Sequence, residues 1–120
     1  MRRRRRTRPP SGLLRAAFCA ALAGWGAGIL VAHAAETHLI VQKDRSFSAD
    51  ATTVAVGDTI QFSNNDDFIH QIYSDTSSVF KFDTDESQPG NSIFIKFTTA
   101  GTFEVHCHIH PKMGLVVTVK

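Results

Sequence analysis

The chain has 120 residues, the length of one ordinary domain, so a large multidomain enzyme and a dinucleotide-binding or barrel enzyme are excluded. Its 13 Lys and Arg outnumber its 11 Asp and Glu, but seven of the eight Arg lie within the first 15 residues. The rest of the chain is mildly acidic, which argues against nucleic acid as a partner.

Residues 1–34 have the three parts of a secretory signal sequence. An arginine cluster is followed by an apolar run, Leu13–Val31, and then by Ala32-His33-Ala34, a small-x-small cleavage motif. Cleavage after Ala34 would leave a domain at 35–120 with six basic and eleven acidic side chains, a net charge of −5. We therefore expect a periplasmic protein without stable membrane insertion, exported by either the Sec or the Tat route. The alternative is a retained anchor, since the apolar run is long enough to span a bilayer.

Cleavage would also leave a single cysteine. Cys19 lies inside the predicted signal sequence, and the bulky Phe18 before it does not fit a lipoprotein cleavage site. Cys107 then has no partner for an internal disulfide in an oxidising compartment. An exported thiol without a partner is expected to be buried or bound, which makes Cys107 the first candidate functional residue.

From Glu36 onward, apolar and polar residues alternate with a period of two, which predicts β-strands. Turn signals such as Gly57-Asp58, Pro89-Gly90 and Ala100-Gly101 separate them, and 63–67 is a polar loop. Seven or eight short strands in about 86 residues predict an all-β Greek-key antiparallel sandwich. A turn of helix within Ser74–Ser78 is left open.

Soft metal-binding side chains are concentrated near the C-terminus. Cys107, His110 and Met113 have the spacing C-x2-H-x2-M, and His70 lies far upstream. Two imidazoles, a thiolate and a distant thioether form the donor set of a blue-copper electron-transfer site. Alternation along the predicted strands turns Cys107 and His70 toward the interior of the sandwich.

Over nearly the whole predicted mature chain, the sequence resembles the cupredoxins, the group of plastocyanin, pseudoazurin and amicyanin. The resemblance is carried by Phe47–Asn64, Asp67–Tyr73, Pro89-Gly90 and Gly101–Met113. The short ligand loop, with Pro111 after its histidine, is most similar to that of amicyanin. The resemblance implies one type 1 copper per chain, with His70, Cys107, His110 and Met113 as its ligands.

The sequence departs from the family pattern at two places. The family commonly has Asn after the first histidine, where it ties the two ligand loops together, and this chain has Gln71. His106 and His108 flank Cys107, as in multicopper oxidases, but the further His-x-His pairs of those enzymes are missing. We therefore treat Gln71, His106, His108 and Pro111 as residues that support the site or pass electrons, and not as ligands.

The predicted function is electron transfer by a monomer that is not itself an enzyme. One electron would pass between redox proteins, which the resemblance to amicyanin suggests are a dehydrogenase and a c-type cytochrome. The main alternative is a periplasmic copper carrier or store that uses the same ligands. A nitrite reductase fragment would need a second metal site, and a structural zinc module would need four strong ligands.

Overall fold

The computed structural model describes residues 24, 26 and 28–120. The arginine cluster, Cys19 and most of the apolar run lie outside these residues, so the signal sequence stays a prediction. Within the described part of the chain, no helix is long and apolar enough to cross a membrane. The segment Ser74–Ser78, for which a helical turn was left open, forms no helix.

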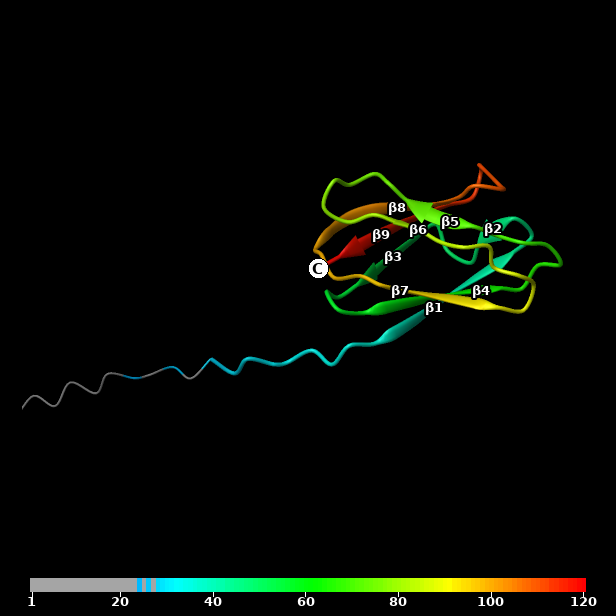
Figure 1. The fold of residues 1–120 in the computed structure, drawn as a ribbon. Coiled ribbons are helices and arrows are strands. Elements are labelled where there is room, and N and C mark those ends of the chain that lie inside the picture. The colour runs from blue at the N-terminus through cyan, green and yellow to red at the C-terminus, as the bar shows by residue number, and fades with distance from the viewer. Residues whose placement is uncertain (1–23, 25, 27) are drawn as a thin grey trace, which may run out of the picture. The chain divides into compact units, whose positions relative to one another are not determined.

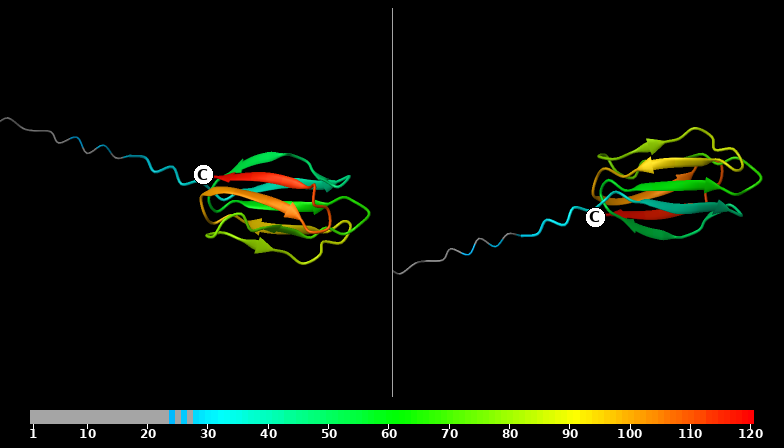
Figure 2. Two further views of the ribbon diagram at one scale, coloured as in Figure 1. Left: turned by 90° about the horizontal axis from the view of Figure 1, so that it is seen from above. Right: turned by 90° about the horizontal axis from the view of Figure 1, so that it is seen from below.

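Residues 31–120 form one compact unit. Its secondary structure consists of nine short strands: β1 (Thr37–Lys43), β2 (Ser46–Phe47), β3 (Ala51–Val54), β4 (Thr59–Asn64), β5 (Ile72–Ser74), β6 (Phe82–Asp83), β7 (Ser92–Lys96), β8 (Gly101–Cys107) and β9 (Gly114–Val119). The strands form two sheets with the orders β2-β1-β4-β7 and β3-β9-β8-β5-β6. The two sheets face each other as layers (Figure 1). Figure 2 shows the molecule from above and from below, so that each panel looks onto a different layer.

The predicted all-β sandwich is confirmed, but both of its sheets are mixed. β1 pairs with β4 in parallel, and so does β3 with β9, whereas the other pairs are antiparallel. The chain changes sheets between β2 and β3 and again between β3 and β4, so strands that are distant in sequence become parallel neighbours. Hydrophobic alternation reports which face of a strand is buried, and it does not report which strand lies beside it.

Alternating residues of β8 and β9 form a large part of the core. In β8, Phe103, Val105 and Cys107 are each at most 1% exposed, while Glu104 between them faces outward. Fully burying an apolar side chain of this size stabilises a fold by about 1.5–3 kcal/mol. Cys107 is therefore the last inward residue of a strand that the core holds in place. The buried apolar side chains are Ile40, Phe47, Val54, Ile60, Phe62, Ile72, Phe97, Phe103, Val105, Cys107, Met113, Leu115, Val117 and Val119.

The turn between β1 and β2 has a backbone conformation that matters for the site. Lys43 pairs with Ser46, so Asp44 and Arg45 alone form the turn, with φ of 54° and 58°. Two consecutive left-handed residues are typical of the type I′ turn, which matches the twist of a hairpin. The turn directs two successive backbone N–H groups toward Asp66.

Asp58, which precedes β4, holds the start of β1. Its buried carboxylate accepts hydrogen bonds from the backbone N–H groups of Glu36 and Ala55, both at 2.9 Å, and from the ring of His38 at 2.8 Å. His33 contacts the same carboxylate at 3.0 Å, but it lies within the predicted signal sequence. The bond from Glu36, followed by those from His38 and Ala55, holds the pKa of Asp58 well below its ordinary value of 3.8, although burial acts to raise it.

Acid should therefore weaken the fold partly through Asp58. A pKa that is lower in the folded state than in the unfolded chain means that the stabilisation is present above about pH 4 and is lost as the pH falls further. Asp58→Asn should lower Tm by several degrees at neutral pH. The further fall in Tm on acidification should be smaller in this variant than in the wild-type protein. Thermal unfolding at neutral pH and at about pH 3 measures both effects. Asp50→Asn, at an exposed carboxylate, is the control, and an unchanged pH dependence in Asp58→Asn would contradict this role.

Candidate metal centre

Three candidate donors converge at one end of the sandwich. Cys107 ends β8, His110 lies in the loop before β9, and His70 precedes β5, where it forms a bridge with Ser87. The Cys107 Sγ atom lies 3.7 Å from Nδ1 of His70 and 3.9 Å from Nδ1 of His110. All three donor atoms lie within 4.8 Å of one another. Cys107 and His70 are buried and His110 is half-buried.

The spacing of these donors fits a single metal ion. Bonds of about 2.0 Å to nitrogen and about 2.3 Å to sulfur, at about 120°, place the two donor atoms about 3.7 Å apart. One thiolate and two imidazoles match the trigonal plane of a blue-copper site, whereas a structural zinc site uses four strong donors. The donor set therefore fits copper in both chemistry and separation.

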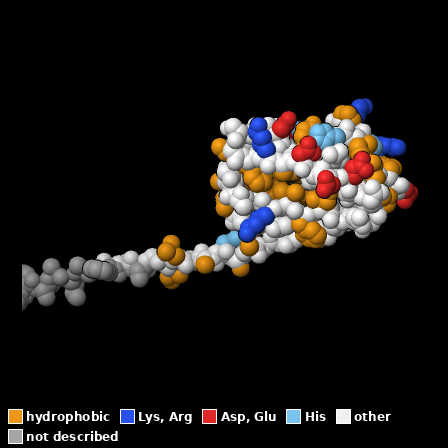
Figure 3. All heavy atoms as spheres, viewed as in Figure 1, with side chains coloured by type: hydrophobic (Ala, Val, Ile, Leu, Met, Phe, Trp, Pro, Cys, Tyr) orange, Lys and Arg blue, Asp and Glu red, His pale blue; other side chains and the backbone are white. Residues whose placement is uncertain are grey.

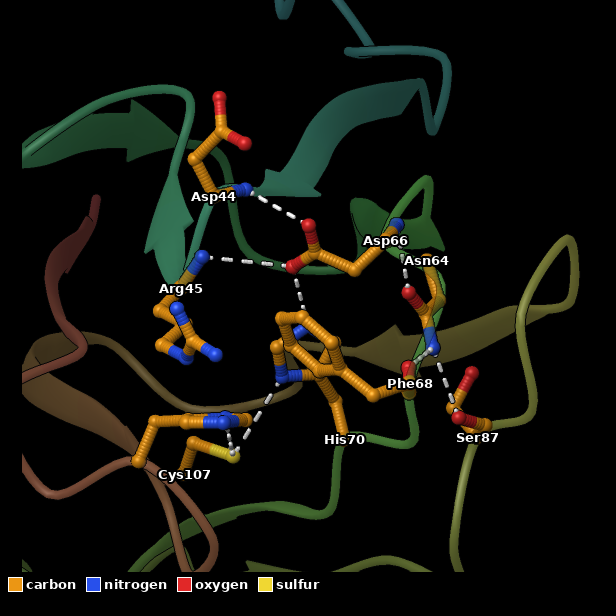
Figure 4. A network of polar contacts seen from close by, with 9 residues as sticks. Asp44, Arg45, Asn64, Asp66, Phe68, His70, Ser87 and Cys107 are labelled. Atoms are coloured by element: carbon orange, nitrogen blue, oxygen red, sulfur yellow. Dashed lines mark hydrogen bonds and ion pairs between the residues drawn. The ribbon is translucent and has the colours of Figure 1, made fainter.

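Asp66 fixes the orientation of the His70 ring. Its Oδ2 atom lies 2.8 Å from Nε2 of His70 (Figure 4), and because a carboxylate accepts, Nε2–H is the donor. This hydrogen bond leaves Nδ1 unprotonated and facing Cys107, which is the tautomer that can bind a metal. Burial acts to raise the pKa of Asp66, but the hydrogen bonds from His70, Asp44 and Arg45 outweigh it and hold the pKa below its ordinary value.

The carboxylate of Asp66 is itself held by backbone groups. It accepts hydrogen bonds from the N–H groups of Asp44, at 2.7 Å, and of Arg45, at 3.3 Å. Asn64 accepts the backbone N–H of Asp66 and donates to the carbonyls of Phe68 and Ser87. These contacts connect the β1–β2 turn, the segment after β4 and the His70 ring in one network (Figure 4).

His110 lies between this network and the surface. Its ring centroid is 5.0 Å from those of Phe68 and His70. The Arg45 guanidinium lies over the Phe68 ring, 4.9 Å from its centroid. Burial lowers the pKa of His110, the positive charge of Arg45 acts in the same direction, and Asp66 opposes them. A lowered pKa favours the neutral imidazole, which is the metal-binding form.

Pro111 shapes the loop that carries Met113. The backbone N–H of Met113 donates to the carbonyl of His110 at 2.9 Å, which closes a β-turn with Pro111 at its second position. Proline favours that position because its ring fixes φ near −65°. Met113 is 1% exposed and forms part of the core. Its role as an axial ligand stays a prediction.

The remaining candidates lie beside the three donors. Gln71 donates from its side chain to the carbonyl of Thr84, and its own carbonyl accepts the N–H of His108, so a main-chain bond connects the two ligand segments. His106 and His108 lie on the outer face, where they contact Glu104 at 3.3 Å and Asp83 at 3.0 Å. The ring of His108 is stacked on Tyr73 at 4.0 Å. Neither belongs to the group of three donors.

Four residues support the site although residue type and spacing do not predict their roles: Asn64, Asp66, Phe68 and Arg45. Asn64 and Asp66 belong to the segment 63–67, which the sequence predicts to be a polar loop. The available signal was a carboxylate four residues before the histidine, which is compatible with a contact in a tight loop. Asp66 is 4% exposed and its oxygens face inward, which composition alone does not predict.

Comparison with known proteins agrees with this combination of a sandwich and a sulfur–imidazole site. Residues 13–119 match the family model of the cupredoxin-like domain. Plastocyanin from Ulva prolifera is 32% identical over 82 residues, which cover 62% of this chain and 84% of that protein. A reduced amicyanin variant matches with a TM-score of 0.64 at 23% identity, covering 70% of this chain and 82% of amicyanin. A purple cupredoxin from Nitrosopumilus maritimus matches with a TM-score of 0.60 at 22% identity, covering 68% of this chain and 98% of that one.

The chain belongs to the cupredoxin family, which confirms the resemblance seen in the sequence. Its cofactor is one type 1 copper, and its general function is electron transfer through that copper. A copper-containing nitrite reductase from Thermus scotoductus also matches, with a TM-score of 0.63 at 26% identity and over 68% of this chain. The chain spans only 22% of that enzyme, so the match concerns one part of a larger protein.

Proposed function

We propose that the protein is a periplasmic electron carrier that shuttles one electron between two redox proteins and has no catalytic activity of its own. Residues 1–34 would direct export and then be cleaved, and residues 35–120 would form the working domain. The observation that supports this proposal most directly is the convergence of His70, Cys107 and His110 within 4.8 Å at one end of a rigid sandwich.

In this proposal, His70, Cys107, His110 and Met113 are the ligands. When bound, a type 1 copper alternates between Cu(I) and Cu(II) and so accepts and donates one electron. The protein keeps its donors in place: β8 holds Cys107, Asp66 holds the His70 ring, and the Pro111 turn holds His110. A site that moves little between the two oxidation states suits rapid transfer.

The rigidity of the site favours an electron carrier over a copper store. A protein that delivers copper must release it, and release is easiest from exposed ligands on mobile loops. Here His70 is fully buried, and its Nε2 atom is hydrogen-bonded to a carboxylate that two backbone N–H groups also hold.

We propose the half-buried edge of His110 as the route for the electron. This ring is the donor nearest the surface, and Ile109 and Pro111 beside it are exposed. A small surface of this kind suits the brief encounters of electron carriers. A dehydrogenase as donor and a c-type cytochrome as acceptor, with a monomeric carrier between them, complete the proposal.

The proposal predicts reversible one-electron cycling. The copper-loaded oxidised protein should show an intense blue absorption and a reversible voltammetric wave, whereas a copper store need not cycle at all. Met113→Leu should keep the colour and raise the reduction potential, because a weak axial donor that favours Cu(II) is lost. Absorption spectroscopy and cyclic voltammetry of both proteins measure this. An irreversible wave would contradict the carrier, and an unchanged potential would restrict Met113 to core packing.

A further inference from the structure

A hollow of about 420 Å³ lies beside the exposed edge of His110, and its lining carries two positive charges. Its lining residues are Arg45, Ser46, Ile109, His110, Pro111 and Lys112. Arg45 comes from the β1–β2 turn and Lys112 from the loop before β9, so two separate segments contribute one cation each. No carboxylate belongs to the lining, and within the described part of the chain neither cation forms an ion pair.

The exposed Arg45 side chain packs against an aromatic ring beside His110. Its guanidinium stacks over the Phe68 ring, and the same ring contacts His110. Its backbone N–H is bound by Asp66, and Figure 4 shows the Asp44 side chain pointing away from the guanidinium. An arginine that is ordered before binding loses less conformational entropy on contact, and its planar group pairs with carboxylates through two hydrogen bonds.

The positive charge of the hollow beside His110 contrasts with the acidic surface over β5 and β6. Figure 3 shows acidic side chains gathered over the region of β5 and β6, and basic side chains at the end that carries the β8–β9 loop, with one acidic group at this end and further basic side chains at the opposite end. Beyond the predicted signal sequence the chain has six basic and eleven acidic side chains, and two of those six cations line this one hollow. An acidic surface is thus attracted beside His110 and repelled over the region of β5 and β6, which orients an encounter.

We propose that this hollow docks a redox protein that carries carboxylates around the exposed edge of its own cofactor, with Arg45 and Lys112 as the contacts. The inference rests on the proposed electron transfer through His110. It adds the sign of the partner's charge and the two residues that recognise it.

The test uses two one-electron oxidants of opposite charge, hexacyanoferrate(III) and tris(phenanthroline)cobalt(III). Each takes one electron from the Cu(I) protein, which becomes Cu(II), while Fe(III) becomes Fe(II) or Co(III) becomes Co(II). Rates are measured by stopped flow on the copper-loaded chain at about 0.01 M and about 0.15 M ionic strength, where charges act over about 30 Å and about 8 Å.

Arg45→Gln should lower the rate of electron transfer to the anionic oxidant about three- to tenfold at low ionic strength. The rate of transfer to the cationic oxidant should not fall. Lys112→Gln, on a different loop, should act in the same direction, so the inference can be tested even if Arg45→Gln disturbs the turn. Lys96→Gln changes the net charge equally, but this exposed lysine lies at the end of β7 that pairs with the start of β4. It should affect both oxidants only slightly.

The possible failures can be told apart. Lys96→Gln could lower the rate of electron transfer to the anionic oxidant as much as Arg45→Gln and Lys112→Gln do. In that case only net charge matters and the docking inference is wrong, while the proposed electron transfer stands. If the wild-type protein exchanges electrons with neither oxidant, the proposed function fails and this inference fails with it.

Discussion

Replacing Cys107 by serine is expected to remove the intense blue absorption of the copper-loaded protein completely while the sandwich still folds. The absorption arises from the thiolate–copper bond, and a hydroxyl does not provide that donor. Serine is close in size to cysteine, so its hydroxyl fits the space of Sγ, which lies 3.7 and 3.9 Å from the two imidazole Nδ1 atoms. We expect a loss of stability of about 1–3 kcal/mol from burying the hydroxyl, which is small enough to leave a folded protein.

Absorption spectroscopy and far-ultraviolet circular dichroism test the colour and the fold separately. The other cysteine, Cys19, provides a control in the full-length chain, because it lies in the predicted signal sequence. Cys19→Ser should leave the blue band unchanged. A blue band that survives in Cys107→Ser would remove Cys107 from the site.

Asp66→Asn should weaken metal binding and raise the reduction potential. Asparagine keeps the shape of the side chain but removes the negative charge that stabilises Cu(II), and it weakens the hold on the His70 ring. Changes to residues that orient a metal-binding histidine cost about 10–100-fold in affinity. The fold should also lose about 1–3 kcal/mol, since the N–H groups of Asp44 and Arg45 no longer meet a charged acceptor.

Competition with a colorimetric chelator measures the affinity, voltammetry the potential, and chemical denaturation the stability. Asp67→Asn is the matched control, because the adjacent carboxylate is exposed and its loss changes the net charge equally. If the two variants shift the affinity and the potential equally, then Asp66 acts only as a distant charge and does not orient the ring.

Much of the sandwich could be predicted because alternation records burial. Phe103, Val105 and Cys107 in β8 face the core as their period of two predicts. The parallel pairs could not be predicted in this way, because pairing depends on contacts between segments far apart in the chain. His70 faces the interior as predicted, but it does not lie in a regular strand. It forms an isolated bridge with Ser87, and the strand begins only at Ile72.

The candidate donors could be proposed from residue type and spacing, since few side chains bind soft metals. Their supporting residues could not, because hydrogen bonding depends on geometry that the sequence does not record. Asp66 and Asp67 are identical neighbours in the sequence, yet the first is buried against His70 and the second is exposed. The assignment of His70, Cys107, His110 and Met113 as ligands stays a prediction.

The pairing of Ile72 with Cys107 also sets an order of events during biogenesis. Cys107 and His70 are 37 positions apart, and the ladder between β5 and β8 helps to bring their donor atoms together. Contacts between segments far apart in the sequence form late in folding, because the chain loses conformational entropy when such segments are brought together. An unfolded polypeptide thus keeps His70 apart from Cys107 and His110, so copper binding by all three donors has to follow folding.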